Sequence, residues 1–181
     1  MKISILLPFK ENFSPSYAGA VSLFVNDTTK ISKYKKKTYI YGNTNYKEIF
    51  NLNYINILPK TNFFQSQNKE YVNEFIKKEQ NIKSDLIELH NRPIYLTYLV
   101  NSLSNRTYIL YFHNDPTTMK GAKSVKERIY LLKNVDKIIF ISKWVKKRFF
   151  KNLPNLSDNN TEIIYHSIDP IKKNVKKNKQ I

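Results

Sequence analysis

Short apolar runs recur along the chain, and the longer segments between them alternate apolar and polar residues with helical spacing. A continuous apolar run bounded by turn-forming residues is typical of a strand that is buried on both faces of a parallel sheet. Gly42-Asn43 ends one such run and Pro59 ends the next, as expected at strand boundaries. The runs predict seven strands, at residues 2–8, 38–41, 55–58, 85–89, 107–112, 137–141 and 162–165.

The intervening segments predict helices, because apolar residues spaced by three and four positions form one helix face. The two clearest stripes are Val21, Phe24, Thr28 and Ile31, and, in a helix predicted at 122–133, Val125, Ile129 and Leu132. Further helices are predicted at residues 69–79, 93–102 and 143–153. The helix at 69–79 should be mostly solvated, with Glu74 and Lys78 placed for an i,i+4 ion pair.

Strands that alternate with helices form βαβ units, and such units produce a parallel sheet with helices on both faces. The predicted fold is therefore a doubly wound, Rossmann-like α/β domain with a mostly parallel sheet of seven strands. In sheets of this kind, ligands bind outside the carboxyl ends of the strands, near the point where the strand order reverses. Candidate site residues are therefore those that directly follow each strand.

All three histidines of the chain follow predicted strands: His90, His113 and His166. Two of them begin the same motif, His-Asn-x-Pro, at residues 90–93 and 113–116. We expect the three imidazoles to line one mouth at the carboxyl rim of the sheet. The other residues at strand ends are Lys10, Glu11 and Gly19; Asn91 and Arg92; Asn114, Asp115, Met119, Lys120 and Gly121; Ser142; and Ser167 and Asp169.

Each of these residues also has a purely structural interpretation. A histidine before such a turn could cap a backbone group, and Asn or Asp before Pro is an ordinary turn former. Ser142 is placed to cap the helix that begins at residue 143. Gly19 could serve only close packing at the entry to a helix, although a helix N-terminus also suits a phosphate group.

Composition and motifs exclude several kinds of chemistry. The absence of Cys excludes disulfides and thiolate catalysis. The histidines lack metal-ligand spacing, so neither a metal nor another cofactor is expected. Neither a P-loop nor G-x-G-x-x-G is present. No apolar run is long enough to span a bilayer, and the N-terminus is a poor signal peptide. We therefore expect a cytoplasmic protein.

The net charge of +17 has two interpretations. It could mark an anionic partner, either nucleic acid or a membrane surface. It could also reflect composition alone, because Lys makes up most of the 31 basic residues, whereas Arg, the main reader of base edges, is rare and scattered. Nucleic acid is therefore disfavoured as a partner, and a peripheral contact with the inner face of the plasma membrane is left open.

Three groups of motifs follow one another along the chain: ELHNRP, FHNDP with MKGAKSVKERIYLL, and KIIFISKWVKKRF leading to IIYHSID. In this order they resemble the N-terminal half of the retaining glycosyltransferases of family 4, which have the two-Rossmann GT-B architecture. The resemblance covers roughly residues 1–170 and is nearest to those members that take part in lipopolysaccharide biosynthesis. Two places depart from the pattern: YAGA at 17–20 stands where two adjacent glycines are usual, and HSID at 166–169 stands for Asn-Gly-x-Asp.

The resemblance implies roles for the residues at the strand ends. His113 would lie beside the transferred sugar as the catalytic residue, Gly19 would approach the donor diphosphate, and His90 with Arg92 would line the acceptor side. Ser142 would face the cleft between two domains. The residues expected to bind substrate are Gly19, His90, Arg92, Asn114, Asp115, Lys120 and Ser142, and those expected at the crossing into a second domain are His166 and Asp169.

The resemblance also implies an incomplete enzyme. Residues 1–170 would hold a glycan or lipid-linked acceptor, whereas the nucleotide-sugar donor would bind mainly to a second, C-terminal domain that is absent from this sequence. Residues 171–181 are expected to be a basic linker or tail. The chain alone should be inactive. The competing interpretation is a non-catalytic basic module that binds nucleic acid or an anionic membrane, and a third is a flavodoxin-like or response-regulator-like domain.

Overall fold

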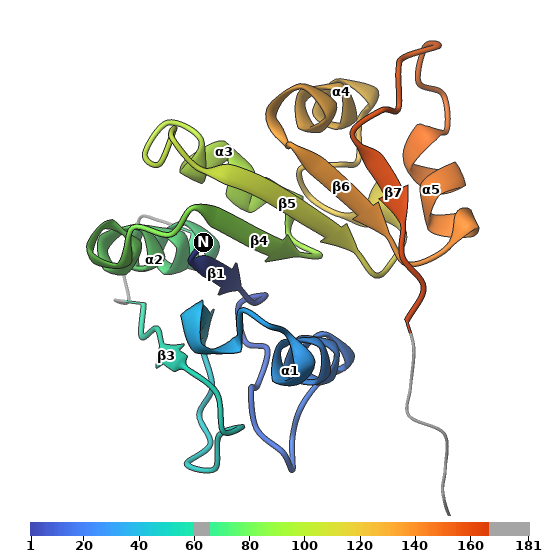
Figure 1. Ribbon diagram of the computed structural model, residues 1–181. Helices are drawn as coiled ribbons and strands as arrows, with labels where there is room; N and C mark the ends of the chain where they lie inside the picture. Colours follow the sequence, from blue (N-terminus) through green and yellow to red (C-terminus); the bar gives the residue numbers. More distant parts are fainter. Residues whose placement is uncertain (60–65, 167–181) are drawn as a thin grey trace, which may run out of the picture.

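The computed structural model describes residues 1–59 and 66–166, and it contains a seven-stranded sheet in which all neighbouring strands are parallel (Figure 1). The strand order is β3-β2-β1-β4-β5-β6-β7. The strands are β1 Ile3–Leu6, β2 Thr38–Gly42, β3 Tyr54–Asn56, β4 Leu86–His90, β5 Thr107–Phe112, β6 Lys137–Phe140 and β7 Thr161–Ile163. The predicted parallel α/β fold is confirmed, and every predicted strand is present.

The strand order places a reversal inside the sheet. The chain builds outward from β1 to β3, and then returns to the other side of β1 with β4 and continues to β7. The reversal therefore lies between β1 and β4, whose carboxyl ends form the usual ligand crevice of such folds. β7 ends earlier than predicted, although the N–H of Ile164 still donates to the carbonyl of Phe140 at 3.0 Å.

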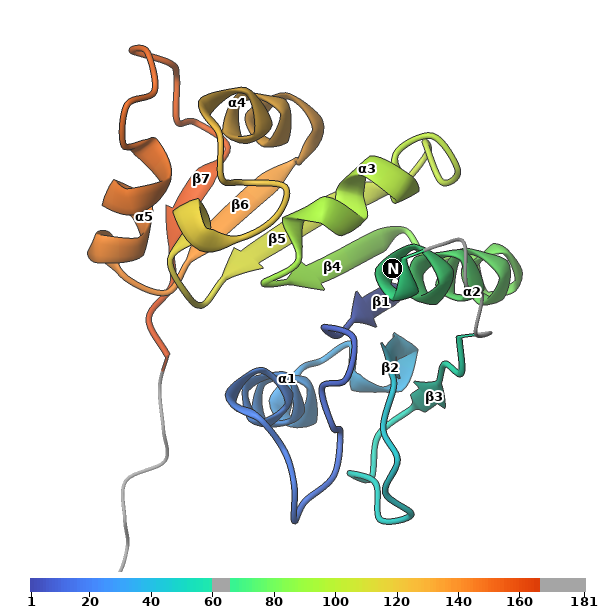
Figure 2. The same ribbon diagram turned by 180° about the vertical axis from the view of Figure 1, so that it is seen from behind.

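The helices cover the two faces of the sheet unequally. α2, α3 and α4 lie on one face, in front in Figure 2, and they share the larger hydrophobic core with α5. α1 lies on the opposite face over a smaller core. The helices are α1 Ala20–Ile31, α2 Gln67–Ile82, α3 Leu96–Leu99, α4 Val125–Asn134 and α5 Lys143–Phe150, with short 3₁₀ turns η1 Lys35–Lys37, η2 Pro93–Tyr95 and η3 Pro116–Thr118.

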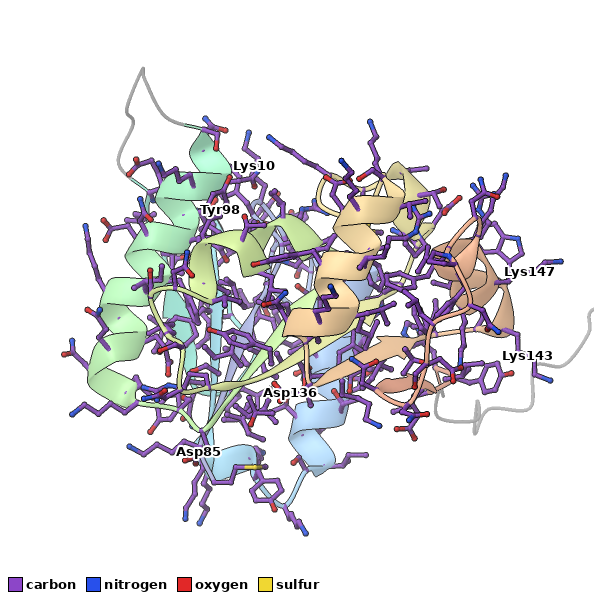
Figure 3. All side chains as sticks on the ribbon, turned by 90° about the horizontal axis from the view of Figure 1, so that it is seen from above. Lys10, Asp85, Tyr98, Asp136, Lys143 and Lys147 are labelled. Carbon is purple, nitrogen blue, oxygen red and sulfur yellow. The ribbon has the colours of Figure 1, made fainter. Side chains whose placement is uncertain are left out.

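The two rims of the sheet differ in what they carry. At the amino rim, Asp85 accepts a hydrogen bond from the backbone N–H of Lys2, just before β1, and Asp136 accepts one from Tyr108 of β5, at 2.6 and 2.7 Å. Figure 3 shows these two residues at the opposite end of the molecule from Lys10, which follows β1. At the amino rim these two carboxylates are thus used by backbone contacts, whereas the residues that follow the strands lie at the carboxyl rim.

The buried stripe of α1 is displaced from the prediction. It consists of Val21, Ser22, Val25 and Thr29. Phe24 is only half buried, and both Thr28 and Ile31 are exposed, Ile31 to 86%. Thr28 donates its hydroxyl to the carbonyl of Phe24 at 2.8 Å, so its polar group is satisfied within the helix and does not face the core. Ile31 is the last residue of the helix. The prediction was wrong for these two positions.

α2 is longer and better buried than predicted. Its buried residues are Tyr71, Val72, Phe75 and Glu79, which lie on one helix face. The prediction of a mostly solvated helix was therefore wrong. The ion pair of Glu74 is formed with Lys77 at 2.6 Å rather than with the predicted Lys78, because positions i+3 and i+4 both reach the same carboxylate.

α4 begins at Val125, later than predicted, because Ser124 and Glu127 form a capping box. Its fully buried residues are Arg128 and Leu131. Arg128 is buried because its guanidinium donates to three backbone carbonyls. The predicted stripe is only half buried: Val125, Ile129 and Leu132.

The two remaining predicted helices are shorter in the structure. The segment predicted at 93–102 begins as the turn η2 and is α-helical only over α3. α5 ends at Phe150 rather than at residue 153. Among residues 1–59 and 66–166, no helix combines the length and the apolar character that crossing a membrane requires.

Candidate active site

The three histidines meet at the carboxyl rim of the sheet. His90 ends β4, His113 directly follows β5, and His166 lies just after β7. The Nδ1 atom of His90 is 2.8 Å from Nε2 of His113, and Nδ1 of His113 is 3.0 Å from Nε2 of His166. The three imidazoles therefore form a hydrogen-bonded row. The expected meeting of the histidines at one rim is thus observed, and their roles stay predictions.

Glu88 extends this row at its inner end. Its Oε1 lies 2.7 Å from Nε2 of His90. Residues two apart on a strand face the same side, so Glu88 and His90 share one face of β4, while Ile87 and Leu89 enter the larger core on the other. The sequence analysis missed Glu88 because it lies within a strand rather than after one. Its position two residues before His90 was the signal that could have identified it.

Aromatic side chains enclose the row from two sides. Phe24 of α1 stacks on His166 with ring centroids 4.6 Å apart and meets His113 edge-on at 5.2 Å. Tyr111 of β5 stacks on His90 at 4.8 Å. His90 is fully buried and His113 is 8% exposed, whereas His166 is exposed. The row is therefore closed at its inner end and open to solvent at His166.

The middle imidazole is neutral at physiological pH. Burial, reinforced by the proximity of His90 and His166, lowers the pKa of His113 to about 2. Burial and the proximity of His90 also lower the pKa of His166. A neutral imidazole donates a hydrogen bond at one ring nitrogen and accepts one at the other. His113 and the exposed His166 can therefore address a ligand as hydrogen-bonding groups rather than as cations.

Gly19 is the N-cap of α1, but the position expected to receive a phosphate is occupied by the protein itself. Oε1 of Glu11 accepts a hydrogen bond from the N–H of Ser22 at 3.1 Å in the first turn of the helix. A Cβ atom at Gly19 would collide with the Glu11 carboxylate. The glycine is thus explained by close approach of a side chain, and the phosphate role predicted for Gly19 requires Glu11 to move.

A pocket of about 270 Å³ lies at the same rim, on the side of the larger core. Among the described residues, its lining contains two of the predicted binding residues, Arg92 and Lys120, and no Asp or Glu. The other lining residues are Asn68, Asn91, Ile94, Thr118 and Met119. Asn91 joins the pocket to the imidazole row, because its Oδ1 accepts from the backbone N–H of His113 at 2.8 Å.

Gly121 shapes the loop that carries Lys120. Its φ is +93°, and a Cβ there would approach the backbone N of Ile94 to 2.5 Å. Both the conformation and the close approach require glycine. The loop with the Met-Lys-Gly motif therefore packs against Pro93 and Ile94, at the end of the first His-Asn-x-Pro motif.

The remaining predicted site residues are engaged in the fold or lie apart from the row. Asp115 accepts hydrogen bonds from the N–H of Thr117 at 2.9 Å and from Nε of Arg148 at 2.8 Å. Ser142 caps α5 by accepting from the N–H of Val145 at 3.2 Å. Asn114 is exposed. Ser167 and Asp169 lie outside the described residues.

The arrangement of the histidines does not form a metal centre. Within the part of the chain that the structure describes, no group of three or more His, Cys, Asp or Glu side chains could hold a metal ion. The imidazoles bond to one another in sequence, so their nitrogen lone pairs do not converge on a common point. What the row offers is hydrogen bonding at its open end.

Solved structures of GT-B glycosyltransferases share this fold over about half of their length. HepE from Anabaena, in complex with UDP and glucose, matches 93% of this chain with a TM-score of 0.65 at 16% identity. The lipopolysaccharide outer core galactosyltransferase WaaB, in its apo form, matches 93% with a TM-score of 0.66 at 13% identity. A sucrose-phosphate synthase structure from Thermosynechococcus elongatus matches 92%, covering 90% of that chain, with a TM-score of 0.59 at 10% identity.

The chain spans less than half of the two transferases, 45% of HepE and 46% of WaaB. No family model matches the sequence, and no curated protein matches it significantly. At these identities the likeness is one of fold.

Proposed function

We propose that this chain is the acceptor-side half of a retaining glycosyltransferase, which moves a sugar from a nucleotide sugar to a cell-surface glycan or a lipid-linked acceptor. The observation that supports this most is the row of imidazoles at the carboxyl rim, open at His166 and linked through Asn91 to a basic pocket. The fold adds support, because HepE, which shares it, is described in complex with UDP-glucose.

The site suits a sugar hydroxyl better than a charged nucleophile. The imidazoles of His113 and His166 are neutral, so each can orient a hydroxyl by donating or accepting a hydrogen bond. Phe24 offers an apolar ring face beside His166, which suits the C–H face of a sugar and helps to exclude water. Arg92 and Lys120 provide positive charge for an anionic group on the same acceptor.

Donor binding is assigned mainly to a second Rossmann domain, which residues 171–181 would connect to residues 1–170. The transferred sugar would pass from the departing diphosphate to an acceptor held by this half, and positioning of the two is a large part of the catalysis required. The chain alone is then expected to bind simple glycosides weakly and to transfer no sugar.

Binding of small probes to the isotope-labelled chain tests this proposal. Methyl α-glucoside and methyl α-galactoside should shift the NMR signals of His166 and Phe24 at millimolar concentration, and UDP-glucose should act more weakly. His113→Ala should weaken the glycoside response, whereas Asn159→Ala, at an exposed position in the loop before β7, should not. If neither glycoside shifts these signals, the acceptor role is wrong.

A second candidate function is a basic module that binds an anionic membrane or nucleic acid, and α5 favours the membrane. Trp144 is 57% exposed beside Lys147 and Lys151, around a surface hollow of about 540 Å³. Figure 3 shows Lys143 and Lys147 projecting outward from this helix. An exposed Trp among lysines is typical of a membrane-surface contact.

Vesicle co-sedimentation separates the two candidates. A membrane module should bind vesicles that contain phosphatidylglycerol and release them as salt rises, and should ignore phosphatidylcholine. Trp144→Ala should then weaken binding, while Tyr130→Ala, a partly exposed aromatic of α4, should not. A nucleic-acid module would instead retain duplex DNA at low salt.

A further inference from the structure

We propose that Glu88, His90, His113 and His166 form a proton relay that accepts a proton at the exposed ring of His166 and leaves the positive charge on His90, beside Glu88. The inference rests on the proposed function only for the source of the proton, a sugar hydroxyl. The relay itself is a property of the ligand-free chain.

The direction of the row is set by Glu88. An ionised carboxylate can only accept hydrogen bonds, so Nε2 of His90 must donate to it at 2.7 Å. Nδ1 of neutral His90 then accepts, which requires Nε2 of His113 to donate across 2.8 Å. By the same argument Nε2 of His166 donates to Nδ1 of His113 at 3.0 Å, which leaves Nδ1 of His166 as an acceptor. One partly buried carboxylate therefore fixes three tautomers.

Proton uptake reverses two of these tautomers. When Nδ1 of His166 takes a proton, its Nε2 proton passes to Nδ1 of His113, and the Nε2 proton of His113 passes to Nδ1 of His90. Three N–H bonds form, and two N–H bonds and one O–H bond of the hydroxyl break. In sugar transfer the acceptor oxygen keeps its electron pair and bonds to the sugar carbon, whose bond to the diphosphate breaks with its electrons leaving on the diphosphate.

The charge comes to rest on His90 because only this ring has a carboxylate partner. A buried cation is tolerated when it is paired at hydrogen-bonding distance, and Glu88 supplies that pair. His113 lies between two imidazoles, and its burial opposes a charge. The middle ring therefore transmits a proton without becoming a stable cation. His90 and Glu88 act as positioning residues, since they meet the hydroxyl only through His113 and His166.

The other groups around the row do not change the tautomers that Glu88 sets. α1 presents Phe24, which carries no charge. β5 presents Tyr111, and burial, together with the nearby carboxylates of Glu88 and Glu162, raises its pKa far above its ordinary value, so it stays neutral. Glu162 of β7 pairs with Lys137 of β6 at 3.8 Å. Among the described residues, Glu88 is the carboxylate that bonds to an imidazole of the row.

Nitrogen NMR of the labelled histidines, recorded through a pH titration without ligand, tests the relay. At neutral pH all three rings should carry their proton on Nε2. On acidification His90 should become an imidazolium, while His113 changes to the Nδ1–H tautomer and remains uncharged. The relay is refuted if His113 keeps its Nε2 proton until the chain unfolds, or if His166 becomes the charged ring.

Glu88→Gln removes the charge while it keeps size and hydrogen bonding. The midpoint of the tautomer change should move to lower pH by about one unit, a tenfold loss of proton affinity worth about 1.4 kcal/mol. Glu162→Gln, on the same face of the sheet, should leave the midpoint within a few tenths of a unit. Equal midpoints for Glu88→Gln and the wild type would overturn the assignment. Glycoside binding is measured separately, so an intact relay with no glycoside response would refute only the proposed function.

Discussion

The two His-Asn-x-Pro turns, residues 90–93 (the first turn) and 113–116 (the second turn), share a sequence pattern and differ in structure. In the first turn Asn91 is buried, has a left-handed φ of +50°, and accepts a hydrogen bond from the backbone of His113. In the second turn Asn114 is exposed, and Asp115 is held by Arg148 of α5. The first turn therefore supports the second, and the second is anchored to a helix.

The difference teaches that the neighbours of each turn, rather than its residues, determine its role. The first turn follows β4, beside the reversal of strand order, where Arg92 reaches a pocket. The second turn follows β5, and the beginning of η3 brings its aspartate to α5. One motif thus contributes a cation to the candidate site, while the corresponding aspartate of the other is used by the fold.

Among the substitutions that distinguish the two turns, Asn91→Ala should have the largest effect on stability. The substitution leaves the buried N–H of His113 without a partner, which costs about 1–3 kcal/mol, and forces alanine into a left-handed conformation, which costs about 1–2 kcal/mol. The free energy of unfolding should fall by about 3 kcal/mol in chemical denaturation. Asn114→Ala, the matching change in the second turn, should stay within about 0.5 kcal/mol.

Asn91→Gly separates the two causes. Glycine adopts the left-handed conformation readily, so this variant should lose roughly 2 kcal/mol, mainly through the missing hydrogen bond to His113. If the glycine variant were as stable as the wild type, the hydrogen bond would contribute little and backbone strain would explain the alanine result.

Asp115→Ala should have the next largest effect, a loss of about 2 kcal/mol. The side chain caps η3 through Thr117 and pairs with Arg148 at 2.8 Å, and a cap and a partly buried pair each contribute about 1 kcal/mol. Thermal unfolding of Asp115→Ala, Arg148→Ala and the double variant measures the coupling. Strict additivity of the two single losses would contradict a direct ion pair.

The same aspartate should produce a smaller, pH-dependent effect. Burial alone would raise the pKa of Asp115, but hydrogen bonds from Arg148 and Thr117 outweigh it and hold the pKa below its ordinary value. A carboxyl group with a lowered folded pKa stabilises the fold above its unfolded pKa, near 3.9, and this contribution is lost as pH falls through the folded value. The stability advantage of the wild type over Asp115→Asn, roughly 1 kcal/mol at pH 7, should therefore shrink below about pH 4.

Much of the fold could be predicted because most of the strands are short, mainly apolar runs, and a run of that kind needs helices on both faces. The meeting of His90 with His113 followed from the same logic, since neighbouring parallel strands end at one rim. The stripe of α1 could not be placed with the same certainty, because a helix of mixed residues can rotate by one position without losing its periodicity, as Thr28 and Ile31 show.

Contacts between distant residues account for what was missed at the site. Nothing in the local sequence indicates that Arg148 binds Asp115 or that Glu11 occupies the first turn of α1, because these partners meet only after the sheet has assembled. Glu88 was overlooked for a different reason. Only residues that directly follow a strand were candidates, whereas Glu88 lies inside the central strand β4 and faces His90.

The smallest effect on stability is expected for Arg92→Ala. This variant tests whether the charged residue of the first turn serves ligand binding rather than folding. Among the described residues, Arg92 donates to the carbonyl of Asn91 at 2.9 Å and forms no ion pair, so its loss should change the free energy of unfolding by less than about 0.5 kcal/mol.

The charge of Arg92 should instead attract an anionic sugar to the pocket that Arg92 shares with Lys120. Titration calorimetry of the Arg92→Ala variant with glucose 6-phosphate should show about tenfold weaker binding than in the wild type, equivalent to about 1.4 kcal/mol. Lys36→Ala, which removes an exposed charge from η1, should leave the affinity unchanged. A strong loss of stability in Arg92→Ala would show that the first turn, like the second, uses its charged residue for the fold.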